Sequence, residues 1–582
     1  MAAPGQPKAP FYIAVGVVIL ALVAFAVQRG GCFRSSPPQV AGTVKPQPPA
    51  PEPAKAEAPD SSIGLTAKEV VFRKPAPLPE VKGTSAYKPL ENNTVRFALN
   101  VWAGWAPIIL ANNGFKAEKT WKAPDGKDFR VELVLIDNPA AMLSAYAAGE
   151  VHVGWGTLDM VPLFVDGMVE KTGRPRDSRV MPRIFQQIDW SNGGDGIVVR
   201  ESIKTVADLR DKKLVLAQNS PSQYFALNML VAAGVQPSEV AMIYTDDAFQ
   251  AAAAFHADRS IAGAVSWSPD IYKLAEAKGN RMLVTTQTAN KLIADVWFAR
   301  ADFARDHPGI IEGLVRGIFD AMEELKKPEQ KAVCAKLMAA GYNVPGEDAV
   351  KMFDDAHNTN WAENFQFFVN QNNPTNFERV WQQSYRLYRQ IGTIQNPAVR
   401  FDQVMDFSVI QKLGSEEKYK SQRDEYQLQL TPKTVGEIRV ELPEILTNTV
   451  VIRFYPNDWD LHKKIMRKTA DGKEVEELYD PAADSVLEGI AQLVGKFGAA
   501  RVIIEGHTDS SMRGQVPVSL VKELAMNRAN AVKQALIAKY NLEPERFQVD
   551  GLGWDRPADP KEPLNQAKNR RVEVKVYPAE RQ

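Results

Sequence analysis

The N-terminal part of the chain contains one unbroken apolar run, from Phe11 to Val27. Its length of roughly 17 residues lies at the short end for a membrane-spanning helix. A cleaved signal peptide is the alternative, but the run ends at QRGG (28–31) and not at a small-x-small cleavage site. We therefore expect residues 1–34 to form a short stub and an uncleaved transmembrane signal-anchor.

From residue 35 to residue 93 the composition changes to Pro, Ala, Lys and Glu, as in VKPQPPAPEPAKAEAP. Such a tract cannot bury a core and favours extended polyproline II. At about 3.1 Å per residue it spans on the order of 100 Å or more. We expect a disordered spacer that lifts folded domains away from a membrane. An ordinary disordered linker is the plainer interpretation, and the two are compatible.

Between residues 94 and 430, short apolar runs alternate with helical patterns. A strand is predicted at 131–136, and Asn138 with Pro139 opens a helix after it. This alternation predicts α/β layers with largely parallel sheets. Further strands are expected at 151–155, 212–217, 240–244 and 262–267, and further helices at 223–233, 248–257 and from Pro269 onward.

Several segments of this region carry a resemblance to a known family: WAGWAPIILANNG (102–114), VELVLIDNPAAMLSAYAAGEVHVGWGTLD (131–159) and GDGIVV (194–199). They look like the periplasmic solute-binding proteins of sulfonate, nitrate and thiamine-precursor ABC importers. The resemblance implies a type II-like fold, in which two lobes joined by crossing strands close on a small organic solute. Asp211 departs from the glycine that the family usually carries in a surface turn.

Ligands of such α/β folds bind at strand C-termini and helix N-termini. Plainer interpretations are that Ser222 and Ser268 only cap helices and that each tryptophan belongs to the core. An aromatic cleft suits an apolar or cationic ligand body, whereas helix N-termini suit an anionic group, so the identity of the solute stays open. The candidate solute-binding residues are Trp102, Trp105, Trp155, Thr157, Ser220, Ser222, Trp267 and Asp270.

After a polar bridge at 431–446, a second α/β unit is expected over 447–582. Its last strand, RVEVKVY, alternates valines with Arg571, Glu573 and Lys575, which predicts one buried face and one wet face. The other expected elements are strands at 450–454 and 501–505, a helix at 485–497 and a long helix at 520–539.

Four segments of this unit carry the most specific pattern in the chain: EGHTD (505–509), NRANAVKQAL (527–536), GLGWDRP (551–557) and NRRVEV (569–574). They resemble the OmpA-like peptidoglycan-binding domain. The resemblance implies a small α/β fold that grips the diaminopimelate arm of the peptidoglycan stem peptide. It assigns the ammonium of that arm to Asp509 and its carboxylate to Arg528. Arg570, Arg571 and Thr508 are added as expected contacts.

The chemistry of this pair can also be argued from the residues. Diaminopimelate carries an ammonium and a carboxylate on one carbon, so its receptor needs an Asp and an Arg close together. Arg528 falls within the apolar stripe of its helix, where an unpaired charge is costly, and a planar guanidinium matches a carboxylate bidentately. The alternative is an internal Asp509–Arg528 salt bridge without a ligand.

Composition and charge narrow the function further. The chain has 70 Lys and Arg residues and 70 Asp and Glu residues, so it lacks a basic surplus. A nucleic-acid-binding protein usually has such a surplus, and the composition therefore does not favour this class. The two cysteines, Cys32 and Cys334, lie far apart and support neither a disulfide framework nor a zinc site. We find no nucleophile–base order, phosphate-binding loop or metal-spaced histidine pair. We therefore expect no enzyme activity, no cofactor and no metal.

These patterns together predict an envelope protein. Because peptidoglycan lies outside the inner membrane, we expect a single-pass inner-membrane protein with a cytoplasmic N-terminus and a periplasmic bulk. It would bind peptidoglycan and a small organic solute, as a transport or sensing receptor. The alternative is an envelope scaffold whose solute-binding fold serves as an interaction platform. A membrane permease or another envelope protein as partner is left open.

Overall fold

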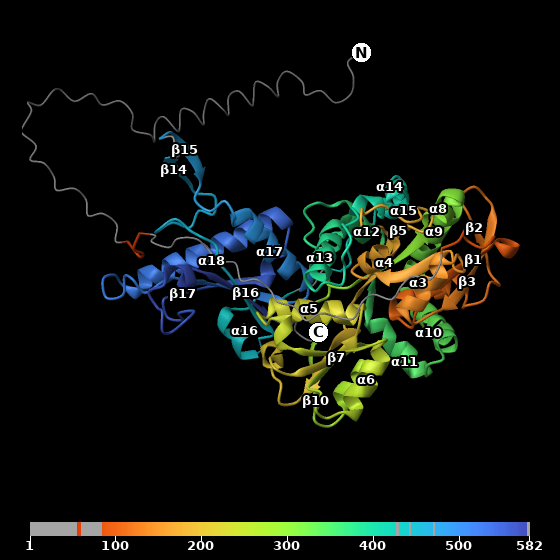
Figure 1. Ribbon diagram of the computed structural model, residues 1–582, viewed down its shortest axis with the longest axis horizontal. Coiled ribbons are helices and arrows are strands. Elements are labelled where there is room, and N and C mark those ends of the chain that lie inside the picture. The colour runs from red at the N-terminus through yellow and green to blue at the C-terminus, as the bar shows by residue number, and fades with distance from the viewer. Residues whose placement is uncertain (1–54, 60–83, 427–429, 442–443, 469–471, 579–582) are drawn as a thin grey trace, which may run out of the picture. The chain divides into compact units, whose positions relative to one another are not determined.

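The computed structural model describes most of the chain from residue 55 onward (Figure 1). The predicted membrane helix at 11–27 lies outside the described residues, as does most of the predicted spacer. Within the described part, we find no helix that has both the length and the hydropathy to cross a bilayer. The described residues are 55–59, 84–426, 430–441, 444–468 and 472–578.

The first lobe is built on a seven-stranded sheet in the order β12-β5-β11-β4-β1-β3-β2. Its strands are β1 (Thr94–Leu99), β2 (Thr120–Lys122), β3 (Asp128–Leu135), β4 (Val153–Thr157), β5 (Pro182–Ser191), β11 (Ala294–Arg300) and β12 (Ala356–Asn358). Its helices include α2 (Ala106–Asn112), α3 (Pro139–Ala147), α4 (Val161–Met168), α8 (Ala301–Asp306), α9 (Pro308–Leu325) and α10 (Pro328–Tyr342). The predicted opening of α3 is confirmed, because the Asn138 side chain accepts a hydrogen bond from the backbone N–H of Ala141.

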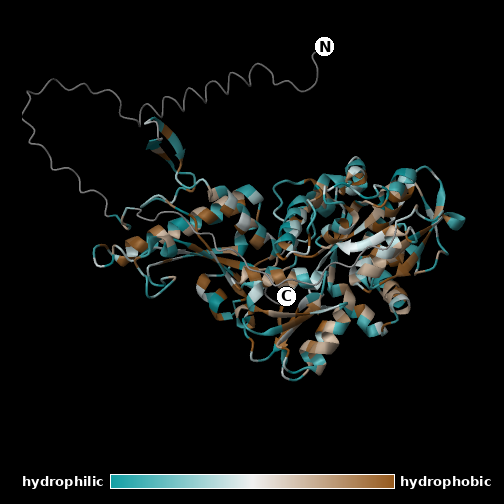
Figure 2. Cartoon of the chain, in the orientation of Figure 1, coloured by the Kyte–Doolittle hydropathy of each residue, from teal (hydrophilic) through white to brown (hydrophobic). Residues whose placement is uncertain are grey.

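The second lobe is built on a five-stranded sheet in the order β10-β6-β9-β7-β8. Its strands are β6 (Asp195–Arg200), β7 (Lys213–Ala217), β8 (Ala241–Thr245), β9 (Gly263–Trp267) and β10 (Asn280–Thr285), and its helices are α5 (Pro221–Ala232), α6 (Ala248–Ala257) and α7 (Asp270–Glu276). The strands of both lobes are predominantly hydrophobic and the connecting loops hydrophilic (Figure 2). This pattern follows from sheets that are covered on both faces.

The prediction of largely parallel sheets is wrong for the strands that link the lobes. Parallel pairing is found for β1 with β3 and β4, and for β7 with β8 and β9. The chain leaves the first lobe along β5, enters the second along β6, and returns along β10 and β11. Strands that cross between the lobes run opposite to their neighbours. In the first lobe β11 therefore pairs antiparallel with β4 and β5. In the second lobe β6 pairs antiparallel with β9 and β10.

Shorter helices complete the solute-binding part of the chain. The strongly amphipathic α13 turns its aromatic side towards the core, where Trp381 stacks on Phe377 and both rings are buried. The helices after α10 are α11 (Gly346–Lys351), α12 (Trp361–Val369), α13 (Phe377–Gln390), α14 (Ser408–Leu413) and α15 (Glu417–Lys420).

The C-terminal domain is a four-stranded sheet in the order β13-β18-β16-β17, with a separate hairpin of β14 and β15. Helices predicted at 485–497 and 520–539 are confirmed as α17 and α18. The elements are α16 (Val435–Glu441), β13 (Leu446–Val450), β14 (Lys464–Lys468), β15 (Glu474–Leu478), α17 (Ala483–Lys496), β16 (Arg501–His507), α18 (Val518–Tyr540), β17 (Phe547–Gly553), α19 (Gln566–Asn569) and β18 (Val572–Tyr577).

Two details of this domain differ from the predictions. The strand expected at 450–454 lies earlier, at β13, because its pairing with β18 runs from Leu446 to Val450 and the chain then leaves the sheet. The face of β18 expected to be wet is half-buried at Glu573 and Lys575. Helix α16 packs on this side of the sheet, with Ile438 in one apolar cluster with Ile503 and Tyr577.

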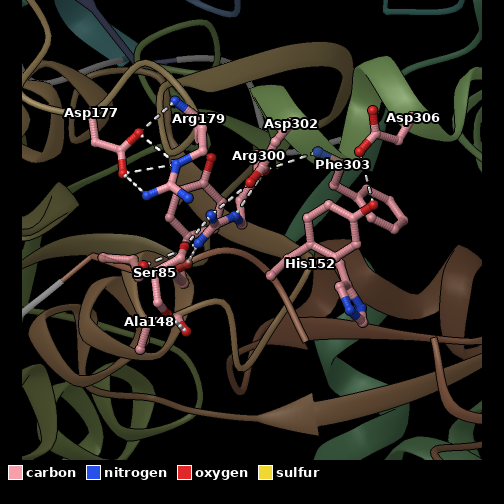
Figure 3. Close-up of polar contacts among 12 residues, drawn as sticks. Ser85, Ala148, His152, Asp177, Arg179, Arg300, Asp302, Phe303 and Asp306 are labelled. Carbon is pink, nitrogen blue, oxygen red and sulfur yellow. Dashed lines mark hydrogen bonds and ion pairs between the residues drawn. The ribbon is translucent and has the colours of Figure 1, made fainter. Parts of the chain in front are cut away.

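The predicted disordered spacer also ends earlier than residue 93. Residues 84–93 lie against the first lobe, where Arg300 holds them (Figure 3). The buried Arg300 guanidinium forms two hydrogen bonds with Asp302, at 3.0 and 2.8 Å, and donates to the backbone carbonyls of Tyr146, Ala147 and Ser85. The end of the spacer is therefore held against the first lobe by the Arg300 guanidinium, whose charge is neutralised by Asp302.

We expect Arg300→Ala to lower the free energy of unfolding by about 3 to 5 kcal/mol, because Asp302 would remain buried without its counter-charge. The exposed Arg179–Asp177 pair beside it (Figure 3) provides the control. Arg179→Ala should cost less than about 1 kcal/mol. Urea unfolding of both variants measures the difference, and equal losses would contradict this account.

Candidate functional sites

The crossing strands bring acidic side chains together between the lobes. Asp189 on β5 and Asp295 on β11 are register partners, and Asp295 also faces Thr157 at the end of β4. Asp195 begins β6, and the hydroxyl of Thr286 accepts its backbone N–H at 3.2 Å. A row of carboxylates therefore follows the crossover from one lobe into the other.

Trp102 lies at this crossover. Its indole Nε1 donates to both carboxylate oxygens of Asp189 at 3.3 Å. Its ring packs against the backbone of Gly194, where a Cβ would lie only 2.4 Å from the indole. Only glycine at 194 allows this contact, and Trp102 is consequently 4% exposed.

The carboxylates at this crossover are strongly perturbed. Burial raises the pKa of Asp159 to about 7 and that of Asp195 to about 7. The pKa values of Asp189 and Asp295 lie well above the usual range, because both are buried and other carboxylates stand nearby. Among the ion pairs of the described residues, none neutralises these four groups. A cluster of this kind favours protons or a cationic ligand.

Several polar atoms around these carboxylates are buried without a partner. Both oxygens of Asp159 lack a hydrogen bond to any described residue, and its side chain is 1% exposed. Buried polar groups are normally hydrogen-bonded, so unpaired ones at a crossover need an explanation. Within the described part of the chain, other unpaired atoms of this region include Thr157 Oγ1, Asp195 Oδ1, Ser222 Oγ and Trp267 Nε1.

The remaining predicted solute-binding residues are engaged elsewhere. Trp105 donates to Asn100 at 2.8 Å within the core, and Trp155 donates to the Ile136 carbonyl at 2.9 Å. The Ser220 hydroxyl donates to the Ala217 carbonyl at 2.9 Å. Asp270 stands at the start of α7, where burial raises its pKa.

The plainer interpretation, that Ser268 only caps the helix after β9, is wrong. That helix, α7, begins at Asp270, and its N-cap is Pro269 without a side-chain bond. The Ser268 hydroxyl donates instead to the carboxylate of Asp355, which also accepts from Tyr272 at 2.7 Å. Burial raises the pKa of Asp355 to about 6.

In the C-terminal domain, α18 lies directly on β16. A Cβ on Gly506 would lie 2.0 Å from the Ala525 carbonyl oxygen, so glycine is required for this close approach. The packing buries Arg528 within the apolar stripe of α18, as predicted. Its Nε donates to the Asp458 carbonyl at 3.0 Å, and its other nitrogens face a carboxylate, that of Glu57, at 2.5 and 2.7 Å.

The predicted peptidoglycan-binding residues fall into two groups. Asp509 follows β16 and pairs with Arg570, whose Nε lies 2.6 Å from Asp509 Oδ2. Thr508 is buried beside it, and its hydroxyl has no partner among the described residues. Arg571 points elsewhere and bonds to Glu573 at 2.8 Å. Asp509 is thus paired with Arg570, which differs from the internal Asp509–Arg528 salt bridge considered above.

Comparisons with known proteins match two separate stretches of the chain. A family model described as "NMT1/THI5 like" matches residues 192–332, and one described as "OmpA family" matches residues 474–571. The chain joins an NMT1/THI5-like solute-binding domain to a C-terminal OmpA domain. Both resemblances inferred from the sequence are therefore confirmed, with the solute-binding domain in the two-lobed form.

The relatives of each domain are separate proteins. The solute-binding domain is similar to the taurine-binding periplasmic protein of Escherichia coli, at 26% identity over 253 residues, which is 41% of this chain and 72% of that protein. The OmpA domain is similar to the outer membrane protein Omp38 of Acinetobacter baumannii, at 39% identity over 84 residues. This match covers 14% of the chain and only 22% of Omp38.

Among solved structures, the chain is similar to the aliphatic sulphonate binding protein SsuA from Escherichia coli, with 19% identity and a TM-score of 0.42. The match covers 54% of this chain and 97% of SsuA. The desulfurization enzyme DszB is also matched, with 16% identity and a TM-score of 0.37.

Within the described residues of the OmpA domain, three side chains lie close enough together to bind one metal ion: Glu505, His507 and Glu573. Cationic side chains already surround it, since Arg439 bonds to Glu505 and Arg571 to Glu573. Burial lowers the pKa of His507 to about 4, so the imidazole is neutral at pH 7.

Sequence reasoning missed the acidic residues of the solute-binding domain. Asp189 and Asp195 stand in the segment IDWSNGGDGIVV, and Asp295 interrupts the apolar run LIADVWF. A carboxylate inside an otherwise apolar strand is an unusual choice for a core position. That signal was available, but only the sheet register shows that these strands adjoin one another.

We expect Asp159→Asn to stabilise the ligand-free protein at pH 8. Burial raises the pKa of Asp159 from 3.8 to about 7, so the folded state holds the proton more tightly than the unfolded chain. The free energy of unfolding therefore falls as the pH rises through this interval. Removing the charge should recover up to about 4 kcal/mol at pH 8 and leave stability near pH 4 unchanged.

Thermal unfolding between pH 4 and pH 8 measures this effect. Asp128→Asn, on an exposed residue of β3, is the matched control and should leave the pH profile as it is. A profile of the Asp159→Asn variant parallel to that of the parent would contradict the burial of an uncompensated charge at this position.

Proposed function

We propose that this protein is a cell-envelope receptor that holds peptidoglycan without cleaving it and binds a small organic solute bearing a cationic amine. The observation that carries the solute class is the buried Asp159 carboxylate, which has no hydrogen-bond partner among the described residues. Asp189, Asp195 and Asp295 belong to the same cluster of buried carboxyl groups. An ammonium group supplies the missing charge and up to three hydrogen-bond donors.

The aromatic residues of the cleft suit the same ligand. Trp102 and Trp267 stand beside the carboxylates, since Trp102 bonds to Asp189 and Trp267 is the register partner of Asp195. Aromatic faces attract cations as well as apolar chains. The taurine for which one relative is named carries an ammonium and a sulfonate. The acidic cleft favours the ammonium end of such a compound.

The peptidoglycan side of the proposal rests on Arg528 and Asp509 of the OmpA domain. A guanidinium buried in an apolar stripe binds a planar carboxylate bidentately, and Asp509 at the end of β16 suits an ammonium. Diaminopimelate carries both groups on one carbon. We assign its carboxylate to Arg528 and its ammonium to Asp509, with Arg570 and Thr508 as neighbours in the pocket.

We further propose that the apolar run at 11–27 anchors the chain in the inner membrane, with a cytoplasmic N-terminus and the described domains in the periplasm. The Pro-rich tract would then separate the membrane from the solute-binding domain. A membrane permease is one candidate partner for a receptor held in this position.

Catalysis is not part of the proposal. Cys334 is the only cysteine of the solute-binding domain, and burial raises its pKa to about 12. Its thiol donates to the Ala106 carbonyl at 3.3 Å. A buried thiol without a neighbouring base is not a nucleophile at neutral pH.

One observation favours a second function, an envelope scaffold. Trp102 packs between Gly104, Gly194 and Asp189, so the protein's own side chain fills the space beside this carboxylate. If the cleft is closed in this way permanently, the solute-binding domain would act only as an interaction platform for envelope proteins.

Calorimetric titration of the full chain with small amines, taurine and alkanesulfonates separates the two functions. A receptor should bind an amine, and Asp159→Asn should weaken that binding at least about tenfold, as expected for the loss of a buried charge pair. Asp128→Asn, on an exposed residue of β3, is the control and should bind like the parent. The absence of any heat across the amine series would favour the scaffold.

Sedimentation with purified sacculi tests the peptidoglycan site. Asp509→Ala combined with Arg528→Ala should abolish co-sedimentation of the full chain, because neither charged group of diaminopimelate would retain its partner. Arg467→Ala, on the exposed hairpin of β14 and β15, should sediment like the parent. Full binding by the double variant would refute the assignment.

A further inference from the structure

A short piece of the Pro-rich spacer lies in the pocket that we assign to peptidoglycan. Residues 55–59, with the sequence KAEAP, are separated in sequence from α18 by more than 450 residues, as the Glu57–Arg528 separation of 471 shows. The spacer was expected to be disordered throughout. Glu57 is instead 2% exposed, which is exceptional for a glutamate in such a tract.

The side chain of Glu57 is bound by arginine. Arg528 Nη1 lies 2.5 Å from Glu57 Oε1 and Arg528 Nη2 lies 2.7 Å from Oε2, which is a bidentate pair. Arg570 Nε lies 3.5 Å from Glu57 Oε1 while it also pairs with Asp509. The carboxylate of the spacer therefore occupies the position that we assign to the carboxylate of diaminopimelate.

The backbone of the segment is held as well. The Glu57 N–H donates to Asn457 Oδ1 at 2.9 Å, and the Asn457 amide donates back to the Glu57 carbonyl at 3.2 Å. Arg570 donates to the Ala58 carbonyl at 2.7 Å, and Gln566 donates to the Pro59 carbonyl at 3.2 Å. These hydrogen bonds involve the backbone of three consecutive residues, so the domain contacts the segment as it would contact a bound peptide.

An apolar contact completes the fit. Ala56 is 6% exposed and packs in one cluster with Val521, Leu524 and Trp554. A methyl group fills this place, and a larger side chain would crowd this small apolar cluster. The pocket thus has one charged position and one small apolar position beside it.

We propose that the OmpA domain binds this acidic segment of its own spacer as an internal ligand, which peptidoglycan must displace. This inference rests on the proposed function, because it assumes that stem peptides use the same pocket. The ligand class is a short alanine-flanked peptide with a free carboxylate. Because the segment is tethered to the domain, its effective concentration near the pocket is high. It can therefore compete with peptidoglycan even if its intrinsic affinity for the pocket is low.

The competition has a measurable consequence. A ligand that requires a pocket occupied nine-tenths of the time binds about tenfold more weakly, because only the free fraction is competent. Freeing the pocket should therefore strengthen the binding of peptidoglycan without any change in the residues that contact it. Glu57 is the residue to change, since it forms no part of the domain that grips the stem peptide.

The test compares Glu57→Gln with Glu52→Gln in the full chain. Both substitutions remove one carboxylate from the same Pro-rich tract, and Glu52 is the control. Co-sedimentation with increasing amounts of sacculi should show a several-fold gain in apparent affinity for Glu57→Gln and none for Glu52→Gln. Equal affinity for Glu57→Gln, Glu52→Gln and the parent would overturn the inference.

Hydrogen–deuterium exchange gives a second readout on the same proteins. The Glu57 amide N–H, which donates to Asn457, should be protected in the parent and in Glu52→Gln, and should lose protection in Glu57→Gln or when soluble stem peptide is added. Unprotected exchange in the parent would overturn the inference. Unchanged sedimentation of the Asp509→Ala/Arg528→Ala variant would instead overturn the proposed function, so the two failures are distinguishable.

Discussion

Burying an ionised group costs much free energy unless an opposite charge or several hydrogen bonds compensate for the lost water. This constraint explains how the buried charges of the described structure are paired. Arg300 shows the complete solution, with Asp302 and three backbone carbonyls around one guanidinium. Arg528 shows a conditional one, because its carboxylate comes from the distant spacer residue Glu57. The Asp159 carboxylate has no hydrogen-bond partner among the described residues.

These three degrees of pairing distinguish structural charges from functional ones. A charge that is paired within its own fold, as Arg300 is, supports architecture. A charge whose partner comes from elsewhere marks a place where a ligand and a part of the chain are interchangeable. A buried carboxylate left without a partner marks a place where a ligand completes the structure.

The two proposed sites have opposite polarity. The OmpA domain presents buried guanidinium groups to a carboxylate, whereas the crossover between the lobes presents buried carboxylates to an ammonium. The proposed function therefore gives one chain separate places for an anionic feature of peptidoglycan and for a cationic solute. The spacer connects this chemistry to the N-terminal apolar run, because its residue Glu57 acts as a ligand within the chain.

The sequence determined both domain families and most helices and strands. Periodicity was sufficient for α17 and α18, and the motif EGHTD was sufficient to place Asp509 at a strand end. The apolar stripe of α18 even predicted that Arg528 is buried and must be paired. These features are local, since each depends on residues within one or two turns of the chain.

Only the tertiary structure decided which partners meet. No local pattern relates Glu57 to Arg528 or Asp189 to Asp295, because these contacts depend on the strand register and on chain segments distant in sequence. The antiparallel return of β11 and the position of α16 on the C-terminal sheet were missed for the same reason. A charge in a sequence indicates that a partner is needed, and the three-dimensional fold determines which group supplies it.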